Sequence, residues 1–273
     1  MPTVQNLKKQ LRGINSTQKL TKAMKTASTV KFSKLNSIYA KHSLYGESCR
    51  QLFEMNKSGL LEMVKAANPD APTAIIVIAG NKGLCGNFNS EILRFAKAEI
   101  EKQENAVVVA CNKKAISFFE SKKIKTEKDF VFSDVPTFDE AAMLLEEIIG
   151  WRILGKISDI HIIYPKYVNM MLQKPTLSNM FSDSKDDFKQ EICFLPDKET
   201  VVKNMATDVF AASFYSIVLE AAIGAQAATL MTMRSAFETA TEYKESLEKQ
   251  INRIRQNAVT ADVLETFAEQ KDN

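Results

Sequence analysis

A glycine-rich loop in the first third of the chain holds the residues that could most readily do chemistry. The loop follows Gly80, and its central residues are Lys82, Gly83, Leu84, Cys85 and Gly86. A glycine-rich turn that leads into a helix N-terminus can bind phosphate. Here the glycines are spaced G-x-x-G-x-x-G, which is not the dinucleotide fingerprint, and no Gly-Lys-Ser/Thr ending follows. The spacing therefore favours a tight strand-to-helix turn over a nucleotide site.

Other reactive side chains are scattered along the sequence. Cys85 could be a nucleophile, but no histidine stands near it in sequence. The four cysteines show no paired spacing that would indicate a zinc site or a disulfide framework. The adjacent carboxylates Asp186-Asp187 and Glu146-Glu147 are better explained as solvated loop or helix faces. We predict no catalytic residue, no metal and no cofactor, and the chain resembles a mechanical or scaffold element.

The last third of the sequence predicts one very long helix. From Asn204 to Gln270 there is no proline and a single glycine, which costs a helix only about 1 kcal/mol. At 1.5 Å per residue, this helix would be on the order of 90–100 Å long, more than a domain of this size can bury. Its second half carries a narrow apolar seam with one slip in a near-heptad pattern: Met233, Ala236, Ala240, Tyr243, Leu247, Ile251, Ile254, Ala258 and Ala261. A narrow stripe on a charged rod predicts a partner helix.

The first residues of the chain predict that partner. No proline interrupts residues 3–58, and an apolar seam begins with Val4, Leu7, Leu11 and Ile14. The seam then continues after an expected register shift at Leu20, Met24 and Ala27. Two long helices with narrow seams, one at each end of the chain, predict an antiparallel coiled coil.

The middle of the chain has the texture of a small α/β domain. Short apolar runs alternate with amphipathic segments, which predicts a largely parallel sheet. The expected strands are 73–79, 106–111, a weak 130–133, 159–164 ended by Pro165, and two further strands at 174–181 and 189–195. The expected helices are 113–121, 138–149 and one capped by Asn89 or Ser90 that runs to about Glu104. We therefore expect three parts: an N-terminal helix over 1–67, an inserted Rossmann-like α/β domain over 68–197, and a C-terminal helix over 198–273.

Charge is unevenly distributed. The net charge is +3, yet residues 1–46 contain eight lysines, one arginine and no acidic residue. A basic helical arm can face nucleic acid, anionic lipid or an acidic protein surface, and it can also be a solvated face. No run approaches about 18 apolar residues, so we expect no membrane span. The N-terminus has no apolar signal core, which predicts a mature start in a reducing compartment.

Three motifs together resemble one family. TQKLTKAMK at Thr17–Lys25 resembles the N-terminal signature of the gamma subunit of F-type ATP synthases. NKGLCGNFN at Asn81–Asn89 resembles the glycine-rich loop of that family, and NRIRQNAVT at Asn252–Thr260 resembles its C-terminal signature. The motifs occur in the family's order, and the layout of the whole chain agrees with it.

The resemblance implies a central rotor shaft without catalytic sites of its own. The implied partners are the ring of alpha and beta subunits, the epsilon subunit and the membrane-embedded c-ring, with no nucleic acid. The implied location is peripheral, on the cytoplasmic side of a cell membrane. Because the sequence starts at Met1 without a presequence and lacks the chloroplast-type insertion, it resembles bacterial forms.

The resemblance also implies contacts with the beta subunits. They fall at Met24 and Lys25 in the first signature, at Arg255, Gln256 and Thr260 in the last, and at Glu265 beyond it. The chain departs from the family where an acidic residue and an arginine usually stand, because it has Ala225 and Thr229 there. That departure removes a charged contact.

Two other classes of function compete with the rotor. One is a coiled-coil adaptor with an α/β head, and the other is a phosphate-binding enzyme that uses the glycine-rich loop. Co-purification with alpha and beta subunits separates the adaptor from the rotor, and a nucleotide-binding assay tests the enzyme.

Overall fold

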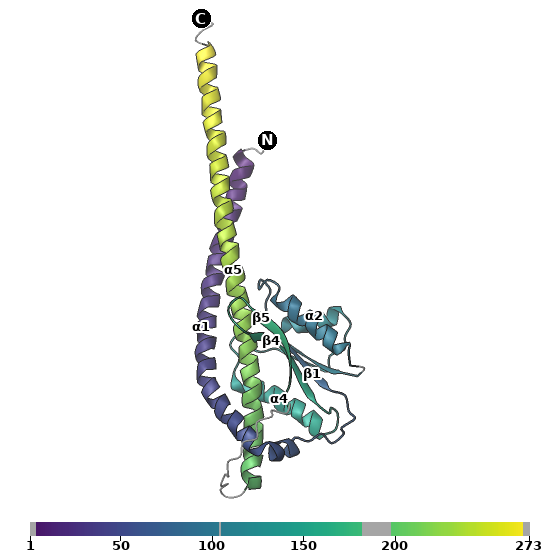
Figure 1. Cartoon of the computed structure of the whole chain (residues 1–273). Helices are drawn as coiled ribbons and strands as arrows, with labels where there is room; N and C mark the ends of the chain where they lie inside the picture. The colour runs from purple at the N-terminus through teal and green to yellow at the C-terminus, as the bar shows by residue number, and fades with distance from the viewer. Residues whose placement is uncertain (1–3, 104, 182–197, 270–273) are drawn as a thin grey trace. The chain divides into compact units, whose positions relative to one another are not determined.

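The computed structural model describes residues 4–103, 105–181 and 198–269 (Figure 1). The described residues form two long helices, three shorter helices and five strands. In chain order the elements are α1 (Val4–Met63), β1 (Ala74–Ile78), α2 (Phe88–Ile100), β2 (Val107–Cys111), α3 (Lys113–Ser121), β3 (Lys128–Phe130), α4 (Phe138–Ile153), β4 (Ile160–Tyr167), β5 (Gln173–Asn179) and α5 (Lys198–Glu269). The predicted fold class, long terminal helices with an inserted α/β domain, is confirmed.

The chain divides into two compact units. One unit consists of Met1–Ala27 with Leu230–Asn273, and the other is Ser28–Thr229. Helices α1 and α5 each contribute to both units, so each unit is described by itself below. The division of the chain at residues 67 and 197 stays a prediction.

The larger unit is built around a five-stranded sheet with the order β3-β2-β1-β4-β5. The first four strands are parallel, and β5 pairs antiparallel with β4 at the edge. All five residues of β1 are buried, as expected for a central strand covered on both faces. Strand β5 corresponds to the strand predicted at 174–181 and forms an antiparallel edge of the sheet.

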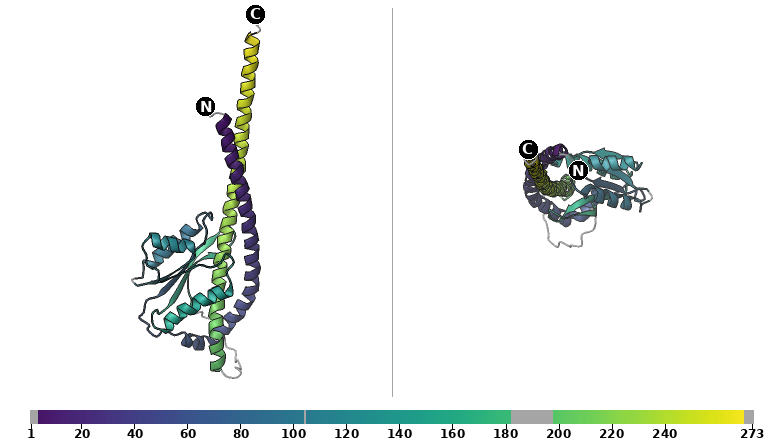
Figure 2. Two further views of the ribbon diagram at one scale, coloured as in Figure 1. Left: turned by 180° about the vertical axis from the view of Figure 1, so that it is seen from behind. Right: turned by 90° about the horizontal axis from the view of Figure 1, so that it is seen from above.

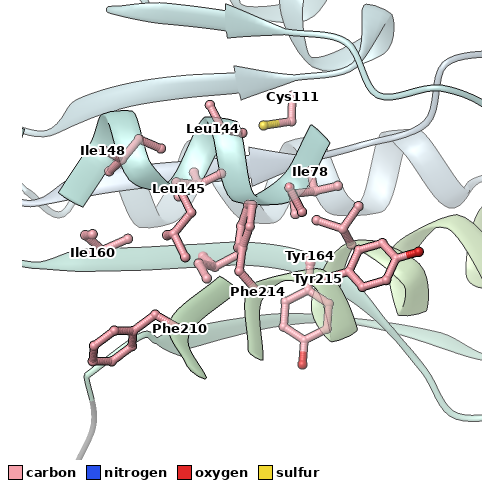
Figure 3. Packing of buried hydrophobic residues seen from close by; sticks show 14 of the residues in the cluster. Ile78, Cys111, Leu144, Leu145, Ile148, Ile160, Tyr164, Phe210, Phe214 and Tyr215 are labelled. Atoms are coloured by element: carbon pink, nitrogen blue, oxygen red, sulfur yellow. The ribbon is translucent and has the colours of Figure 1, made fainter. Parts of the chain in front are cut away.

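Side chains alternate across the sheet into two cores. On one face Ile75 and Val77 pack with Ile92 of α2 and Phe119 of α3. On the other face, Ile76 and Ile78 belong to a larger cluster with α4 and the two long helices, and Figure 3 shows its centre. The members from those helices include Leu35, Leu144, Leu145, Ile148, Phe210, Phe214 and Val218. Figure 2 gives the arrangement of these helices from two further sides.

Several predicted boundaries are corrected. Pro165 lies inside β4, opposite Pro175 of β5 and beyond the last residue that pairs with β1, so it interrupts no ladder with a central neighbour. Helix α2 begins at Phe88, and the side chain of Asn89 turns back to the glycine-rich loop instead of capping the helix. The weak third strand is Lys128–Phe130. The strand predicted at 189–195 lies outside the described residues.

One stretch of α5 is long and apolar enough to cross a membrane by length and composition alone, within Asp208–Ala261 of the described residues. No such stretch was predicted. In the structure 61% of that window is buried inside the protein. Phe210, Phe214 and Leu219 from its first half belong to the core on the sheet. Packing as a core helix therefore accounts for the apolar composition.

The smaller unit is an antiparallel helix pair. Gln18 Nε2 of α1 donates a hydrogen bond to Thr241 Oγ1 of α5 at 2.8 Å. Seven less exposed residues of α1 recur here with an uninterrupted 3-4 spacing: Val4, Leu7, Leu11, Ile14, Gln18, Thr21 and Lys25. Those of α5 do the same: Leu230, Met233, Phe237, Ala240, Lys244, Leu247, Ile251 and Ile254. Both seams are strict heptads, as a left-handed supercoil requires.

The predicted seam was therefore wrong at several positions. Leu20 is 59% exposed and Tyr243 is 46% exposed, whereas the heptad passes through Thr21 and Lys244. The register shift inferred for α1 and the slip inferred for α5 do not occur. The predicted seam contained only apolar residues. The observed seam also contains polar residues, because a small or long-stemmed side chain can pack there with its polar group hydrogen-bonded or exposed to water.

The seam of α5 also ends earlier than predicted. Val4, the first residue of α1, lies fourteen residues before Gln18, and Arg255 lies fourteen residues after Thr241. The start of α1 is therefore level with Arg255. Ala258 and Ala261 are exposed, because α5 continues past the end of its partner (Figure 1).

Candidate functional site

The glycine-rich loop is held by its own polar groups. The Gly80 amide donates to Asn89 Oδ1 at 2.8 Å, and Asn89 Nδ2 donates to the Lys82 carbonyl at 3.0 Å. A Cβ atom at Gly80 would stand 2.8 Å from that same Asn89 oxygen, so a glycine is needed there. Asn89 therefore closes the loop on itself, and the motif works as a tight turn.

Two more asparagines tie the loop to the neighbouring strand ends. Asn81 Nδ2 donates to the Phe132 carbonyl at 2.9 Å. Asn112 Nδ2 donates to the Ala79 carbonyl at 2.7 Å, and Asn112 Oδ1 accepts from the Phe132 amide at 2.9 Å. These groups lie at the carboxyl edge of the sheet, where ligands bind in open α/β folds. Here they bind backbone instead.

Helix α5 fills the crevice between the ends of β1 and β4. A Cβ atom at Gly224 would lie 3.2 Å from Gln173 Cγ, 3.4 Å from Phe88 Cε2 and 3.6 Å from the Pro165 carbonyl oxygen. Next to it, Ala228 forms a small buried cluster with Cys85 and Phe88, and the partly buried Ala225 packs against that cluster. The place where a doubly wound sheet usually takes a ligand is thus occupied by protein.

Two small residues stand at this contact in place of the charged ones of the family pattern. Ala225 lies against an apolar cluster, where an unpaired carboxylate would be costly. Thr229 Oγ1 donates to the Ala225 carbonyl at 2.8 Å, so its polar group is satisfied within the helix. The two small residues suit the close approach of α5 to the loop.

We expect a larger side chain at Gly224 to disrupt this contact. The substitution Gly224→Val should lower the free energy of unfolding by about 1–3 kcal/mol, because the site is already filled. Gly150 in α4 is the matched control, since nothing lies within 4 Å of a Cβ atom there. Gly150→Val should leave stability unchanged or slightly higher in a denaturant titration of the full chain. Equal effects of the two substitutions would show that α5 does not fill the crevice.

Cys85 is poorly suited to act as a nucleophile. Its side chain is buried, and burial is the main cause that raises the pKa of its thiol. Asn89 Nδ2 donates to its sulfur at 3.0 Å. The other described cysteines, Cys49 and Cys111, are also buried free thiols, and Cys193 lies outside the described residues. Among the described residues, no group of three or more His, Cys, Asp or Glu is placed to hold a metal ion.

Lys82 forms an ion pair with Asp134, which was not among the predicted site residues. Its Nζ lies 2.7 Å from Asp134 Oδ2, and Lys31 of α1 forms an ion pair with the same oxygen. The hydrogen bonds from Lys31 and Lys82 lower the pKa of the Asp134 carboxyl, and the bond to Asp134 raises the pKa of Lys82. These residues are 103 and 52 positions apart from Asp134, so no local pattern could have revealed the network.

The residues of the first signature lie on the helix pair. Met24 and Lys25 are both half-buried, and Lys25 occupies a position of the heptad seam. Their neighbours Lys22 and Ala23 are exposed. Met24 and Lys25 therefore present only part of their side chains to any further partner.

The predicted contact residues of the last signature lie at the level where α1 begins and beyond it. Arg255, Gln256 and Thr260 are exposed, and Thr260 Oγ1 donates to the Gln256 carbonyl at 2.9 Å. Lys25 is level with Arg234 of α5, so about 30 Å of helix separates Lys25 from Arg255. Glu265 belongs to the described backbone of α5, and its side chain lies outside the description. The predicted contact residues thus form two separate groups.

The fold and the site together define a class of protein. It has an antiparallel helix pair and an α/β unit in which a helix of the same chain fills the crevice that usually binds a ligand. A sequence profile of the ATP synthase family matches residues 3–268. The chain belongs to that family.

Similar proteins indicate which members of the family the chain resembles. The chain is 27% identical over 289 residues to an ATP synthase gamma chain of Rhodopirellula baltica, with 97% of each chain covered. It is 28% identical over 294 residues to the ATP synthase gamma chain of Desulforudis audaxviator, again with 97% of each covered. The same name and coverage hold for a Mycoplasma mycoides protein, at 28% identity over 280 residues.

Solved structures share the fold. A chain of the Euglena gracilis mitochondrial ATP synthase, in an assembly described as OSCP/F1/c-ring, superposes with a TM-score of 0.67 at 16% identity. The match covers 98% of this chain and 93% of that one. A chain of the Tetrahymena thermophila mitochondrial ATP synthase central stalk and c-ring gives 0.63 at 19% identity, covering 80% and 99%.

Proposed function

We propose that this chain is the central rotor subunit of an F-type ATP synthase. The observation that carries the proposal is the end of α5, which extends beyond its partner helix and exposes Arg255, Gln256 and Thr260 at and beyond the level where α1 begins. Full-length similarity to proteins named ATP synthase gamma chain supports it. The subunit itself is not catalytic, and its partners are the alpha and beta subunits, the epsilon subunit and the c-ring.

The rotor works through differential contact. A shaft without symmetry meets each beta subunit differently at each rotary angle. A contact that forms in only some angles stabilises the conformation of the beta subunit that makes it, and so shifts the populations of states with different nucleotide affinity. Ion flow through the c-ring turns the shaft during synthesis, and hydrolysis turns it the other way.

The exposed end of α5 has the chemistry for such contacts. Arg255 offers five donors in a fixed fork, and Gln256 offers both donors and an acceptor. These groups suit an acidic, hydrogen-bonding loop on a beta subunit. Met24 and Lys25 form a second contact about 30 Å away along the pair, and Glu265 forms a contact nearer the end of α5.

The complex to which the chain belongs is membrane-associated. We place this chain in the part of the complex that lies on the cytoplasmic side of a bacterial cell membrane, held there through its partner subunits. The bacterial sources of the relatives support that placement.

Co-purification tests the proposal. The full chain, carrying an affinity tag, is expressed together with the alpha and beta subunits of its own source. We expect to recover a complex of all three subunits that has ATPase activity. The chain alone should show no such activity, and the tag alone should recover no alpha or beta subunit. Recovery of the chain without alpha and beta subunits, or with a different partner, would favour the coiled-coil adaptor.

A further inference from the structure

The segment Ser133–Thr137, here named the bridging loop, joins the sheet to both long helices. It follows β3 and leads into α4. On one side, Asp134 Oδ2 receives Lys31 of α1 and Lys82 of the glycine-rich loop. On another side, the Pro136 carbonyl accepts a buried hydrogen bond from the Tyr215 hydroxyl of α5 at 3.0 Å. All of these residues belong to the larger unit.

The bridging loop is itself fixed to α4. Thr137 and Glu140 form a reciprocal capping box: the Glu140 amide donates to Thr137 Oγ1 at 3.3 Å, and the Thr137 amide donates to Glu140 Oε2 at 3.0 Å. The Ser133 amide donates to the other oxygen of the same carboxylate, Glu140 Oε1, at 3.3 Å. Glu140 therefore ties both ends of the bridging loop to the start of α4.

Tyr215 carries the connection on to α1. Its ring makes T-shaped contacts with Phe138 of α4 at 5.7 Å and with His42 of α1 at 4.8 Å. His42 Nε2 lies 2.9 Å from the Ala212 carbonyl oxygen of α5. The polar contacts of the bridging loop thus reach both long helices, α1 through Lys31 and α5 through Tyr215.

The charges at Asp134 make this link sensitive to a single group. Two ammonium groups converge on one carboxylate oxygen, whose negative charge holds them there against their mutual repulsion. Removing the negative charge leaves Lys31 and Lys82 adjacent, so attraction turns into repulsion. An ordinary surface ion pair does not change sign in this way when one partner is neutralised.

We propose that Asp134 is a positioning residue for torque transfer, which makes the glycine-rich loop and the bridging loop move as one body with α1. The proposal rests on the rotor function. Torque on the α/β unit is then transmitted to α1 through Asp134 and to α5 through Pro136 and Tyr215, in addition to transmission through the apolar core.

Amide hydrogen exchange on the full chain tests the link without reference to function. In Asp134→Asn, we expect amides of residues 80–89 to exchange about three- to tenfold faster, the range for losing a charge-assisted bond at a site one-third exposed. Adding Lys82→Gln removes the repulsion and should slow the exchange again. The matched control is Glu147→Gln, because Glu147 pairs with Lys128 at 2.8 Å with similar exposure but touches neither long helix through that pair.

A second measurement tests the role in coupling. Membrane vesicles with equal amounts of complex are assayed for uncoupled ATP hydrolysis and for the steady ion gradient that hydrolysis maintains. Asp134→Asn should keep hydrolysis and lower the gradient, and Glu147→Gln should change neither. Unchanged exchange at residues 80–89, an unchanged gradient, or an equal loss in Glu147→Gln would each overturn the proposal. If the rotor function were wrong, the chain would fail to assemble with alpha and beta subunits, while the exchange comparison would still decide the link.

Discussion

Replacing Leu247 with aspartate should cost the helix pair of the smaller unit about 3–5 kcal/mol, the usual effect of an unpaired charge in a buried position. Leu247 is 1% exposed and stands on the heptad seam, level with Arg12 of α1. Arg12 is exposed and lies off the seam, which Leu7, Leu11 and Ile14 line on the opposite helix. The aspartate can reach water only if the two helices separate there.

The measurement is thermal and denaturant unfolding of the full chain, followed by helical signal and by amide exchange in residues 4–25. Ile251→Asp should have a smaller effect, because Ile251 is half-exposed. Val259→Asp is the matched control, since Val259 is 57% exposed beyond the end of α1, and it should change stability by less than about 0.5 kcal/mol. Equal losses at Leu247 and Val259 would contradict the seam.

The double substitution Arg255→Ala, Gln256→Ala should leave the complex assembled and reduce its turnover. Both side chains are exposed, and neither supports the helix pair. Losing a charge-assisted hydrogen bond costs roughly 1.5–3 kcal/mol. If the bond forms at only some rotary angles, this loss changes the balance between states by about ten- to a hundredfold.

Turnover is measured as ATP hydrolysis and ATP-driven ion pumping in membranes with matched complex content. Arg253→Ala is the control, because Arg253 is an equally exposed arginine that points elsewhere around the same helix. Wild-type turnover and pumping in the double variant, or the same loss in Arg253→Ala, would mean that the signature makes no specific contact here.

Much of the fold could be predicted because it depends on strong, repeated signals. The long helices follow from the absence of proline, and the sheet follows from short apolar runs between amphipathic segments. Helix α3 lies where it was predicted, at Lys113–Ser121. Signals of this kind are local, so they survive without knowledge of the tertiary structure.

The details of the helix seam could not be predicted from apolarity. Gln18, Thr21, Lys25 and Ser28 take seam positions that an apolar pattern assigns elsewhere. What decides the seam is the fixed period of two supercoiled helices, and a polar pair such as Gln18 and Thr241 can satisfy it. A constant seven-residue period, applied to the sequence without regard to apolarity, identifies these positions.

The glycine-rich loop illustrates the limit of motif reading at the site. Its spacing correctly argued for a turn. The reason became visible only in the structure, where Gly224 and Ala228 of α5 pack into the crevice from a distant part of the chain. The ion pairs of Asp134 are equally nonlocal, so sequence spacing could not indicate them.

Rotation of a labelled chain tests the central claim most directly. Lys125, whose side chain is 90% exposed in the larger unit, can be replaced by cysteine for a probe in a chain with Cys193→Ser, since the three described cysteines are buried. Complexes with alpha and beta subunits are fixed to a surface through the beta subunits, and ATP is added. The rotor account predicts that the probe turns steadily in one direction while ATP is hydrolysed. Hydrolysis by the intact complex with the probe held at a fixed angle would contradict it.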